Sequence, residues 1–364
     1  MRRWVLAAVL VVALAGNIYA ADVLQEEAGI LGADKLREGL TGESAALLED
    51  VSPVEGGDFA GNLQKIFRAV VEQAGGWVRA GLRTCAGMLA VGLICAAAGT
   101  MGGERLETAA RMAGCLAIAA LCTAELDGMA GLAKRTLEEL SDFSALLLPV
   151  LSSALAASGG VTSGGALYAG ATLLVSVLTN LIRSFLIPCV YGYLFLATAE
   201  HAIGDGRLTR LRELAGWVVK TVLRAAVAAF TVYLTLTGML AGATDELTLK
   251  AAKGVVSASI PVVGSMISEA SQAILTSAGV IRQASGAFGM LAVLATALGP
   301  FCRIGAQYLA LRATAALGGF VAQKEQTGLL GCAAEAMGDL LAMTGSAAVM
   351  VLVAVCAFLK AVNG

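Results

Sequence analysis

The chain has 364 residues, of which 58% are hydrophobic and only 14% are charged, and its mean hydropathy is +0.80. A soluble domain carries about 25% charged residues, so this composition excludes an ordinary soluble fold. The formal net charge of −2 gives no sign of a nucleic-acid-binding protein. Because aromatic residues are scarce and glycines number 44, the composition predicts closely packed transmembrane helices built from small and aliphatic residues.

The N-terminus has the features of an export signal. Arg2 and Arg3 form a positive start, residues 4–14 form a short apolar core, and Ala20 ends a stretch of small residues. We therefore expect residues 1–20 to act as a signal sequence, either cleaved after Ala20 or kept as an anchor.

Residues 21–76 are the one clearly hydrophilic stretch, with 11 acidic and 4 basic groups. Acidic groups hardly oppose translocation, whereas lysine and arginine do, so we expect a short acidic ectodomain outside the cytoplasm. Within it, Leu63, Ile66 and Val70 recur at helical spacing. This pattern predicts an amphipathic helix that lies on the membrane surface or against a partner.

The rest of the chain contains apolar runs long enough to cross a membrane, which takes about 20 residues. Four runs are free of charge: 84–103, 225–244, 283–302 and 340–359. A longer charge-free run, 143–182, predicts two helices joined by a glycine-rich turn at 158–165, and 184–199 is a further apolar run. Two runs, 112–124 and 254–281, are ambiguous, and the second is a candidate for a broken or re-entrant helix.

These runs predict an all-α polytopic membrane protein with seven to nine transmembrane helices. We expect a first helix group at 77–199, a basic interfacial helix at 200–224 and a second helix group at 225–364. The interfacial helix is expected on the cytoplasmic face, because it concentrates basic side chains. These are Arg207, Arg210, Arg212, Lys220 and Arg224.

Three pairs of glycines have the G-x-x-x-G spacing that lets two helix backbones approach closely. The pairs are Gly99 with Gly103, Gly160 with Gly164, and Gly238 with Gly242. We expect them to be helix-packing positions within the chain, and self-assembly is the alternative.

Several ionisable residues lie among apolar neighbours, where a charge is costly and often marks a functional pathway. They are Arg183, Glu200, His201, Glu269, Arg282 and Arg303. Glu269 is the leading candidate, together with Pro261 and Gly264, because these three lie in the broken segment. His201 precedes the turn at 204–206, so we expect it to lie in a loop.

Signatures of enzymes are missing from the sequence. It contains no H-E-x-x-H, no G-x-S-x-G and no G-x-x-x-x-G-K-[ST] phosphate loop, and it has one histidine. The eight cysteines include no C-x-x-C pair and mostly fall in apolar runs. We therefore expect no catalytic residues, no cofactor and no metal site.

The segments 249–253 and 259–270, with the core I-P-V-V-G-x-M-x-x-E-A, resemble the stage III sporulation protein AE family of endospore-forming bacteria. The stretch 311–317, the turn at 157–160 and the tail at 361–364 fit the same family. The resemblance covers nearly the whole chain, and its specific motifs lie after residue 140. The first 76 residues match only in their general plan.

The resemblance implies a multi-pass protein of the mother-cell membrane around the forespore, the outer forespore membrane. It implies a component of a secretion-like channel between the two cells, needed for late forespore gene expression. The implied partners are other proteins of the stage III A operon, including an ATPase, and a forespore-membrane protein, besides membrane lipid. The alternative function is a stand-alone secondary transporter with its substrate site near Pro261.

Overall fold

The computed structural model describes residues 26, 28–54, 57–101, 104–204, 206–259 and 263–361. It describes the backbone alone at 34, 104, 238–259, 263–275 and 321. Every regular element in these ranges is helical, as the composition predicted, and the expected signal sequence at 1–20 lies outside them.

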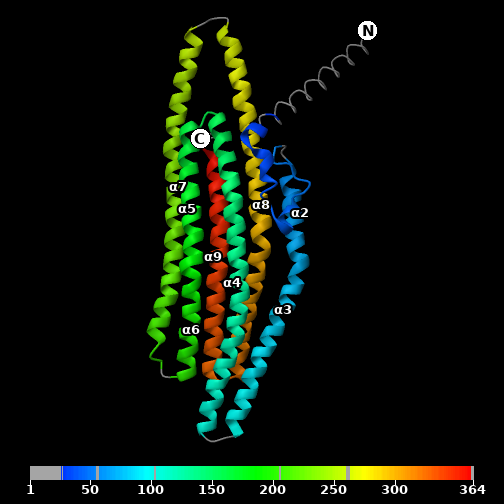
Figure 1. Ribbon diagram of the computed structural model, residues 1–364, viewed down its shortest axis with the longest axis vertical. Helices are drawn as coiled ribbons and strands as arrows, with labels where there is room; N and C mark the ends of the chain where they lie inside the picture. The colour runs from blue at the N-terminus through cyan, green and yellow to red at the C-terminus, as the bar shows by residue number, and fades with distance from the viewer. Residues whose placement is uncertain are drawn as a thin grey trace, which may run out of the picture.

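Six long helical columns form the body of the protein (Figure 1). They are α3 (Phe59–Met101), α4 (Glu104–Ala157), α5 (Val161–Leu181) continued through the π-turn η2 (Ile182–Leu186) into α6 (Ile187–Ile203), α7 (Thr209–Ser259), α8 (Val263–Val321) and α9 (Lys324–Lys360). The column from Val161 to Ile203 is continuous, and its π-turn lies just before Pro188, which has no backbone N–H to donate.

The expected number of seven to nine spans is wrong for the described residues, because six helices there are long and apolar enough to cross a membrane. The run 112–124 is part of α4, which continues to Ala157, and the run 184–199 continues from α5. Both were separated from their neighbours in the sequence by charged residues. Those charged residues lie inside continuous helices, so they do not mark helix ends.

Successive columns run antiparallel, because each pair is joined by a short connection. The α3–α4, α6–α7 and α8–α9 connections therefore lie at one end of the bundle, and the α4–α5 turn and the end of α9 lie at the other (Figure 1). Helix α9 occupies the middle and packs against α4, α5, α6, α7 and α8. Its buried side chains are mainly alanine, leucine, methionine and valine, so the centre of the bundle is apolar.

The helices are much longer than a bilayer is thick. They have from 37 residues in α9 to 59 in α8, or about 55 to 90 Å at a rise of 1.5 Å per residue. The hydrocarbon core measures about 30 Å. At least part of every column must therefore lie outside the hydrocarbon. An ion pair between Glu138 and Arg183 links α4 and the α5–α6 column part way along their lengths.

Residues 28–54 wrap over the outside of α4 and α8 and contain two short elements, η1 (Ala33–Leu36) and α2 (Gly42–Leu47). Leu36, Leu48 and Val51 are buried, and the hydroxyl of Ser285 on α8 donates to the carbonyl of Pro53 at 3.0 Å. The acidic stretch is thus packed on the bundle here, and the amphipathic helix expected around residues 63–71 forms the first part of α3.

Large apolar side chains remain exposed on the outer faces of the bundle. Ile94 on α3, Leu173 on α5, Phe195 on α6 and Trp217 on α7 are all more than 60% exposed. Exposed apolar surface of this extent belongs at a membrane or a protein interface. The exposed apolar side chains therefore indicate that lipid or partner proteins surround the bundle.

The turn between α4 and α5 reverses the chain in three residues. Gly159 has a φ of 103°, a backbone conformation that residues other than glycine rarely adopt. The N–H of Gly160 donates to the carbonyl of Leu155 at 2.9 Å. Gly164 then brings α5 against α4, where the hydroxyl of Ser152 donates to the Gly164 carbonyl at 2.9 Å. The predicted glycine-rich turn is therefore present, but it is shorter than the predicted 158–165, because α5 already begins at Val161.

Replacing Gly164 with valine should destabilise the α4–α5 hairpin. A Cβ at this position would lie 2.9 Å from the carbonyl oxygen of Ser152, which is part of the α4 backbone and has little room to move. Overpacking of this kind costs about 1–3 kcal/mol. The thermal unfolding midpoint of the purified protein in detergent measures the loss.

The matched control is Gly165→Val, because no described atom lies within 4 Å of a Cβ built there. The two variants carry the same intrinsic cost of valine in a helix. Equal losses for both would show that the close approach at Gly164 is unimportant.

Candidate functional site: a charge network between three helices

A network of charged and polar side chains lies where α6 ends and α7 begins. The chain reverses between them through Gly204 and Gly206, whose φ angles are 78° and 66°. Such positive values favour glycine, so the sequence G-D-G at 204–206 permits a tight connection. The reversal places Glu200, near the end of α6, opposite Arg212, near the start of α7.

Arg212 and Glu200 form a largely buried ion pair. The guanidinium Nε of Arg212 lies 2.7 Å from Oε2 of Glu200, and the two side chains are 17% and 12% exposed. The hydroxyl of Thr209 donates to the other carboxylate oxygen of Glu200 at 2.5 Å. Both oxygens of this carboxylate are therefore occupied, which offsets the cost of removing its charge from water.

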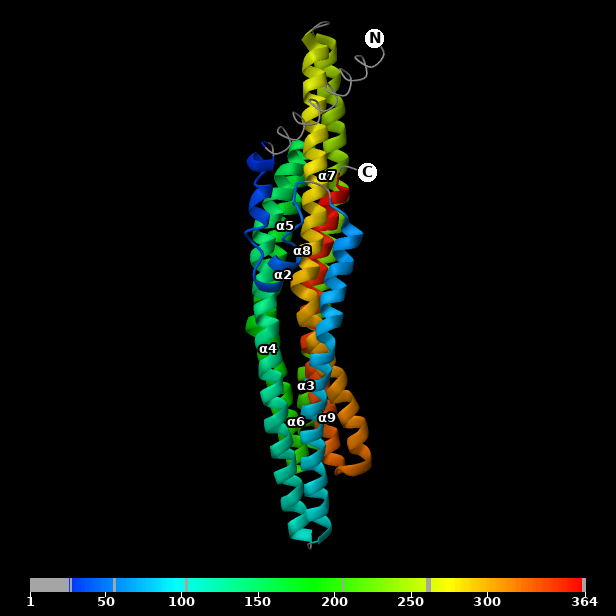
Figure 2. The ribbon, with the colours of Figure 1, turned by 90° about the vertical axis from the view of Figure 1, so that its right-hand side faces the viewer.

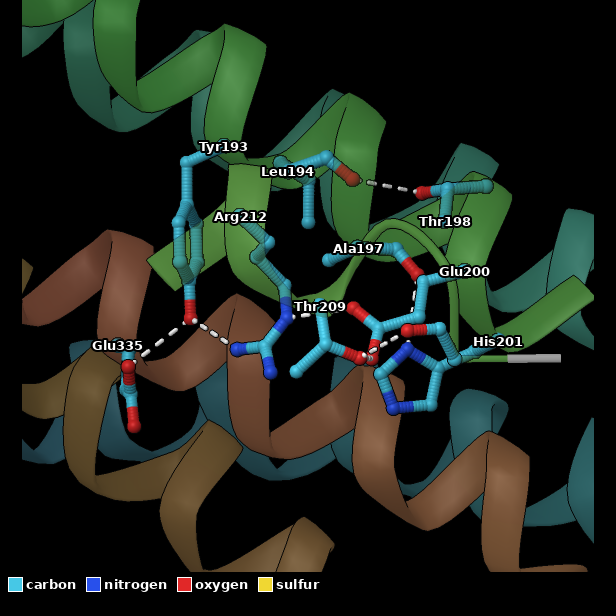
Figure 3. A network of polar contacts seen from close by, with 10 residues as sticks. Tyr193, Leu194, Ala197, Thr198, Glu200, His201, Thr209, Arg212 and Glu335 are labelled. Atoms are coloured by element: carbon cyan, nitrogen blue, oxygen red, sulfur yellow. Dashed lines mark hydrogen bonds and ion pairs between the residues drawn. The ribbon is translucent and has the colours of Figure 1, made fainter. Parts of the chain in front are cut away.

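Tyr193 extends the network from α6 to α9. Arg212 Nη1 donates to the Tyr193 hydroxyl at 3.4 Å, and its guanidinium carbon lies 5.9 Å from the centre of the tyrosine ring. The hydroxyl in turn donates to Oε2 of Glu335 on α9 at 2.9 Å (Figure 3). Lys220 on α7 lies 3.7 Å from the same oxygen. Charged groups of both signs, bridged by the hydroxyl of Tyr193, thus join the three helices.

Asp339 lies one helical turn beyond Glu335 on α9 and is only 8% exposed. Two carboxylates at this spacing share one side of the helix. Glu335 and Asp339 therefore place two carboxyl groups on one side of α9, and Lys220 of α7 pairs with the first of them. These ion pairs and hydrogen bonds hold α6, α7 and α9 against one another. No group of His, Cys, Asp and Glu side chains in the described residues could hold a metal ion.

His201 is adjacent to Glu200 in sequence but points elsewhere. The structure places it in the last turn of α6, so the expected loop position is wrong. Its Nδ1 lies 2.8 Å from the carbonyl of Ala197, and its other ring nitrogen lies against Gly328 of α9. A side chain at 328 would overlap the imidazole, so glycine there lets α6 and α9 approach.

The other candidate residues are spread over the fold. Arg183 pairs with Glu138, Arg282 is buried with Nη1 3.5 Å from the Ser158 hydroxyl, and Arg303 is exposed. Each of these three belongs to a different part of the bundle.

The candidates in the broken segment lie far from the charge network. Gly264 and Glu269 fall in the first turns of α8, where the backbone alone is described, and Pro261 lies outside the described residues. They lie near the far end of α7, a helix of 51 residues or about 75 Å, whereas Arg212 lies near its start. The structure thus places the Glu269 segment and the charge network at opposite ends of α7.

The G-x-x-x-G glycines are also spread along the columns. A Cβ at Gly99 would lie 3.2 Å from Nε2 of Gln323, and Gly160 is the residue before α5. Gly238 and Gly242 lie in α7 where the backbone alone is described, and Gly103 lies outside the described residues.

The sequence analysis did not single out Tyr193, Glu335 and Asp339, and it assigned Arg212 to the basic residues of an interfacial helix. The sequence did contain one feature that could have indicated the two carboxylates of α9. Glu335 and Asp339 lie four residues apart within an otherwise apolar run, and such carboxylates require partners.

The fold and its apolar surface define a class: an all-α protein with six helices able to cross a membrane. The model of the family "Stage III sporulation protein AE" matches residues 47–361, so the chain belongs to this family. A relative is Stage III sporulation protein AE of Bacillus subtilis (strain 168), 23% identical over 172 residues. That alignment spans 47% of this chain and 43% of the relative, less than half of either. No solved structure matches the chain.

Family membership supports a role in sporulation and agrees with the resemblance seen in segments 249–253, 259–270 and 311–317. The matched range begins at residue 47, within the acidic stretch, and ends at the last residues of the described chain. It therefore contains all six long helices and the entire charge network.

Replacing Arg212 with methionine should destabilise the bundle strongly. The substitution keeps much of the side-chain volume but leaves Glu200 with an uncompensated, largely buried charge. Breaking a buried pair costs about 3–5 kcal/mol, and the residual exposure of this pair favours the lower part of that range. The thermal unfolding midpoint in detergent is the measurement.

The double variant Arg212→Met with Glu200→Met should recover most of the loss, because it removes both charges. Arg210→Met is the control for losing a positive charge from an exposed position of the same helix. If Arg210→Met and Arg212→Met lowered the unfolding midpoint equally, the Arg212–Glu200 ion pair would not be what stabilises the bundle here.

Proposed function

We propose that this protein is the polytopic membrane component of a channel complex between the mother cell and the forespore. In this proposal it lies in the mother-cell membrane that surrounds the forespore. The complex is needed for late gene expression in the forespore. The observation that best supports this proposal is the family match, which covers all six long helices.

The shape of the bundle supports a role within an assembly. The α3–α4 hairpin extends beyond the other helices at one end, and α7 with α8 extends beyond them at the other (Figure 2). A transmembrane bundle needs only about 20 residues per helix, so these extensions offer surfaces to other proteins on both sides of a membrane. Gly264 and Glu269 belong to the α7–α8 extension, and we propose the segment that contains them and Pro261 as a partner contact.

The sequence also bears on the source of energy. The chain has no phosphate-binding loop of the G-x-x-x-x-G-K-[ST] type. We propose that energy for transport comes from an ATPase encoded in the same operon. Its contact surface on this chain would be the exposed basic residues near the start of α7, among them Arg210.

Deleting the gene in its native host should block the late forespore programme after engulfment is complete. A fluorescent reporter under a late forespore promoter, followed by microscopy in engulfed cells, measures this. We expect engulfment at the normal frequency, loss of reporter signal and collapse of the forespore, all restored by the intact gene at a second locus.

Normal spores from the deletion strain would overturn the proposal. A partial outcome is also informative. If the deletion blocks the programme, complementation with Glu269→Gln tests the α7–α8 extension, with protein abundance measured alongside to separate a lost contact from a lost protein.

A further inference from the structure

Helix α8 contains a belt that has the length of a membrane crossing. Arg282 and Arg303 bracket 20 residues without a charge, which is about 30 Å of helix. This length equals the thickness of the hydrocarbon core of a bilayer. Because a charge is costly in hydrocarbon, the two arginines bracket the part of α8 that fits there.

Contacts between the columns place α9 and α4 relative to this belt. A Cβ at Gly345 of α9 would lie 2.8 Å from the ring of Phe301 on α8, so the charge-free run 340–359 of α9 lies beside the belt. A Cβ at Gly289 of α8 would lie 2.6 Å from the side chain of Leu147 on α4. This second contact fixes the level of α4.

Helices α5 and α7 continue the belt. The hydroxyl of Ser152 on α4 donates to the carbonyl of Gly164 near the start of α5. The hydroxyl of Tyr233 on α7 donates to the carbonyl of Ala166 on α5 at 3.4 Å. The charge-free runs of α5 and α7 therefore lie at the same level as those of α8 and α9.

Helix α3 is charged at this level. A Cβ at Gly81 would lie 2.9 Å from Cβ of Ala310, and α3 runs in the same direction as α8. The residues 9 to 16 positions before Gly81 therefore lie 9 to 16 positions before Ala310, inside the belt. Among them are Lys65, Arg68 and Glu72, which share one side of α3 and have side chains 59%, 81% and 66% exposed.

Helix α4 carries a matching charged stripe. Arg135, Glu139 and Asp142 are exposed and share one side of the helix. They lie 5 to 12 positions before Leu147, and α4 runs opposite to α8. This places them at the level of the residues 5 to 12 positions after Gly289, again inside the belt.

The hydrophilic segment 28–54 lies over α8 between the two stripes (Figure 2). Asp50 lies 4.0 Å from Lys65 of α3, and a Cβ at Gly39 would overlap the side chain of Leu146 on α4. The short elements of the segment are joined by turns, whose backbone groups lipid cannot satisfy. Such backbone is tolerated at membrane depth only where protein buries it or water reaches it.

The two stripes and the segment together form one hydrophilic face at the level of the belt. Its charged side chains cannot face lipid, and the cores of protein interfaces are depleted of lysine, glutamate and aspartate. Water is therefore the surrounding that fits this face. On the opposite side of the bundle, Leu173 and Val177 of α5 are exposed and apolar, as lipid requires (Figure 1).

We propose that the bilayer lies across the belt and that the hydrophilic face lines water at this depth, in a lumen enclosed by further copies of this chain. Copies arranged with this face inward keep Leu173 and Val177 outward in lipid. The two stripes carry three positive and three negative groups, which suits water and small hydrated solutes of either charge. The proposal concerns the chain in any membrane, so it holds or fails independently of the role in sporulation.

Reactivity of introduced cysteines tests the face in the full-length protein in membrane vesicles, in a background without the eight native cysteines. The variants Arg68→Cys and Glu139→Cys are compared with Leu173→Cys and Val177→Cys, all at exposed positions within the belt. A charged methanethiosulfonate reagent reacts with thiolate, which forms in water and not in hydrocarbon. We expect the first pair to react about tenfold faster or more than the second.

Rapid reaction at all four positions would overturn the proposal, because the bilayer would then lie elsewhere. Slow reaction at all four would also overturn it, because lipid or protein would then cover the hydrophilic face. Unfolding in sodium dodecyl sulfate is the control for an intact thiol, since all four variants should then react alike.

Ile66→Cys is the matched control for folding, because Ile66 is fully buried on the same turn of α3 as Lys65. We expect it to react slowly while Arg68→Cys reacts rapidly. Equal reaction at the two positions would mean that α3 has separated from the bundle, and the assignment of the face would be wrong.

The enclosing copies are tested by coexpressing the chain with two different affinity tags. After purification on the first tag in mild detergent, we expect the second tag to be retained. Tags mixed only after solubilisation should not be retained together. Rapid reaction of Arg68→Cys in a protein that is strictly monomeric would overturn enclosure by copies of the chain.

Discussion

The architecture depends on one mismatch, between the length of the helices and the thickness of a bilayer. Columns of 37 to 59 residues are roughly two to three times as long as the hydrocarbon requires. Parts of each column must lie outside it, and there charged side chains can be kept without a large penalty. The mismatch explains why charges recur within helices that are otherwise apolar, and why two pairs of helices extend past the rest.

Polar contacts matter in such a bundle because the usual driving force is weak. Between helices in lipid, burial of apolar surface gains little, so close backbone approach and interhelical hydrogen bonds hold the helices together. The chain uses both devices. Gly164 and Gly328 bring helices close together, and the network of Arg212, Glu200 and Tyr193 fixes α6, α7 and α9 relative to one another.

The sequence predicted the helical class and the α4–α5 turn because those depend on local chemistry. A charge-free run containing S-G-G and followed by more apolar residues has few alternatives, and the turn falls at 158–160. Helix ends were harder to predict, because an ionisable residue marks a helix end only when nothing compensates its charge. Arg183 is compensated by Glu138, 45 positions away in the sequence, and so the helix continues through it.

The site was predicted less well for the same reason. Arg212 has the sequence context of an exposed basic residue, and only the approach of Glu200 and Tyr193 turns it inward.

The most direct test of a six-crossing bundle is the sidedness of its connections. Single cysteines at Val161, where α5 begins, at Arg207 between α6 and α7, and at Lys324, where α9 begins, are exposed positions for a membrane-impermeant maleimide. In intact vegetative cells that carry the protein in the plasma membrane, we expect labelling of Val161→Cys alone, and labelling of all three after the membrane is permeabilised. Labelling of Val161→Cys and Arg207→Cys from the same side would contradict the account, because an odd number of crossings must separate them.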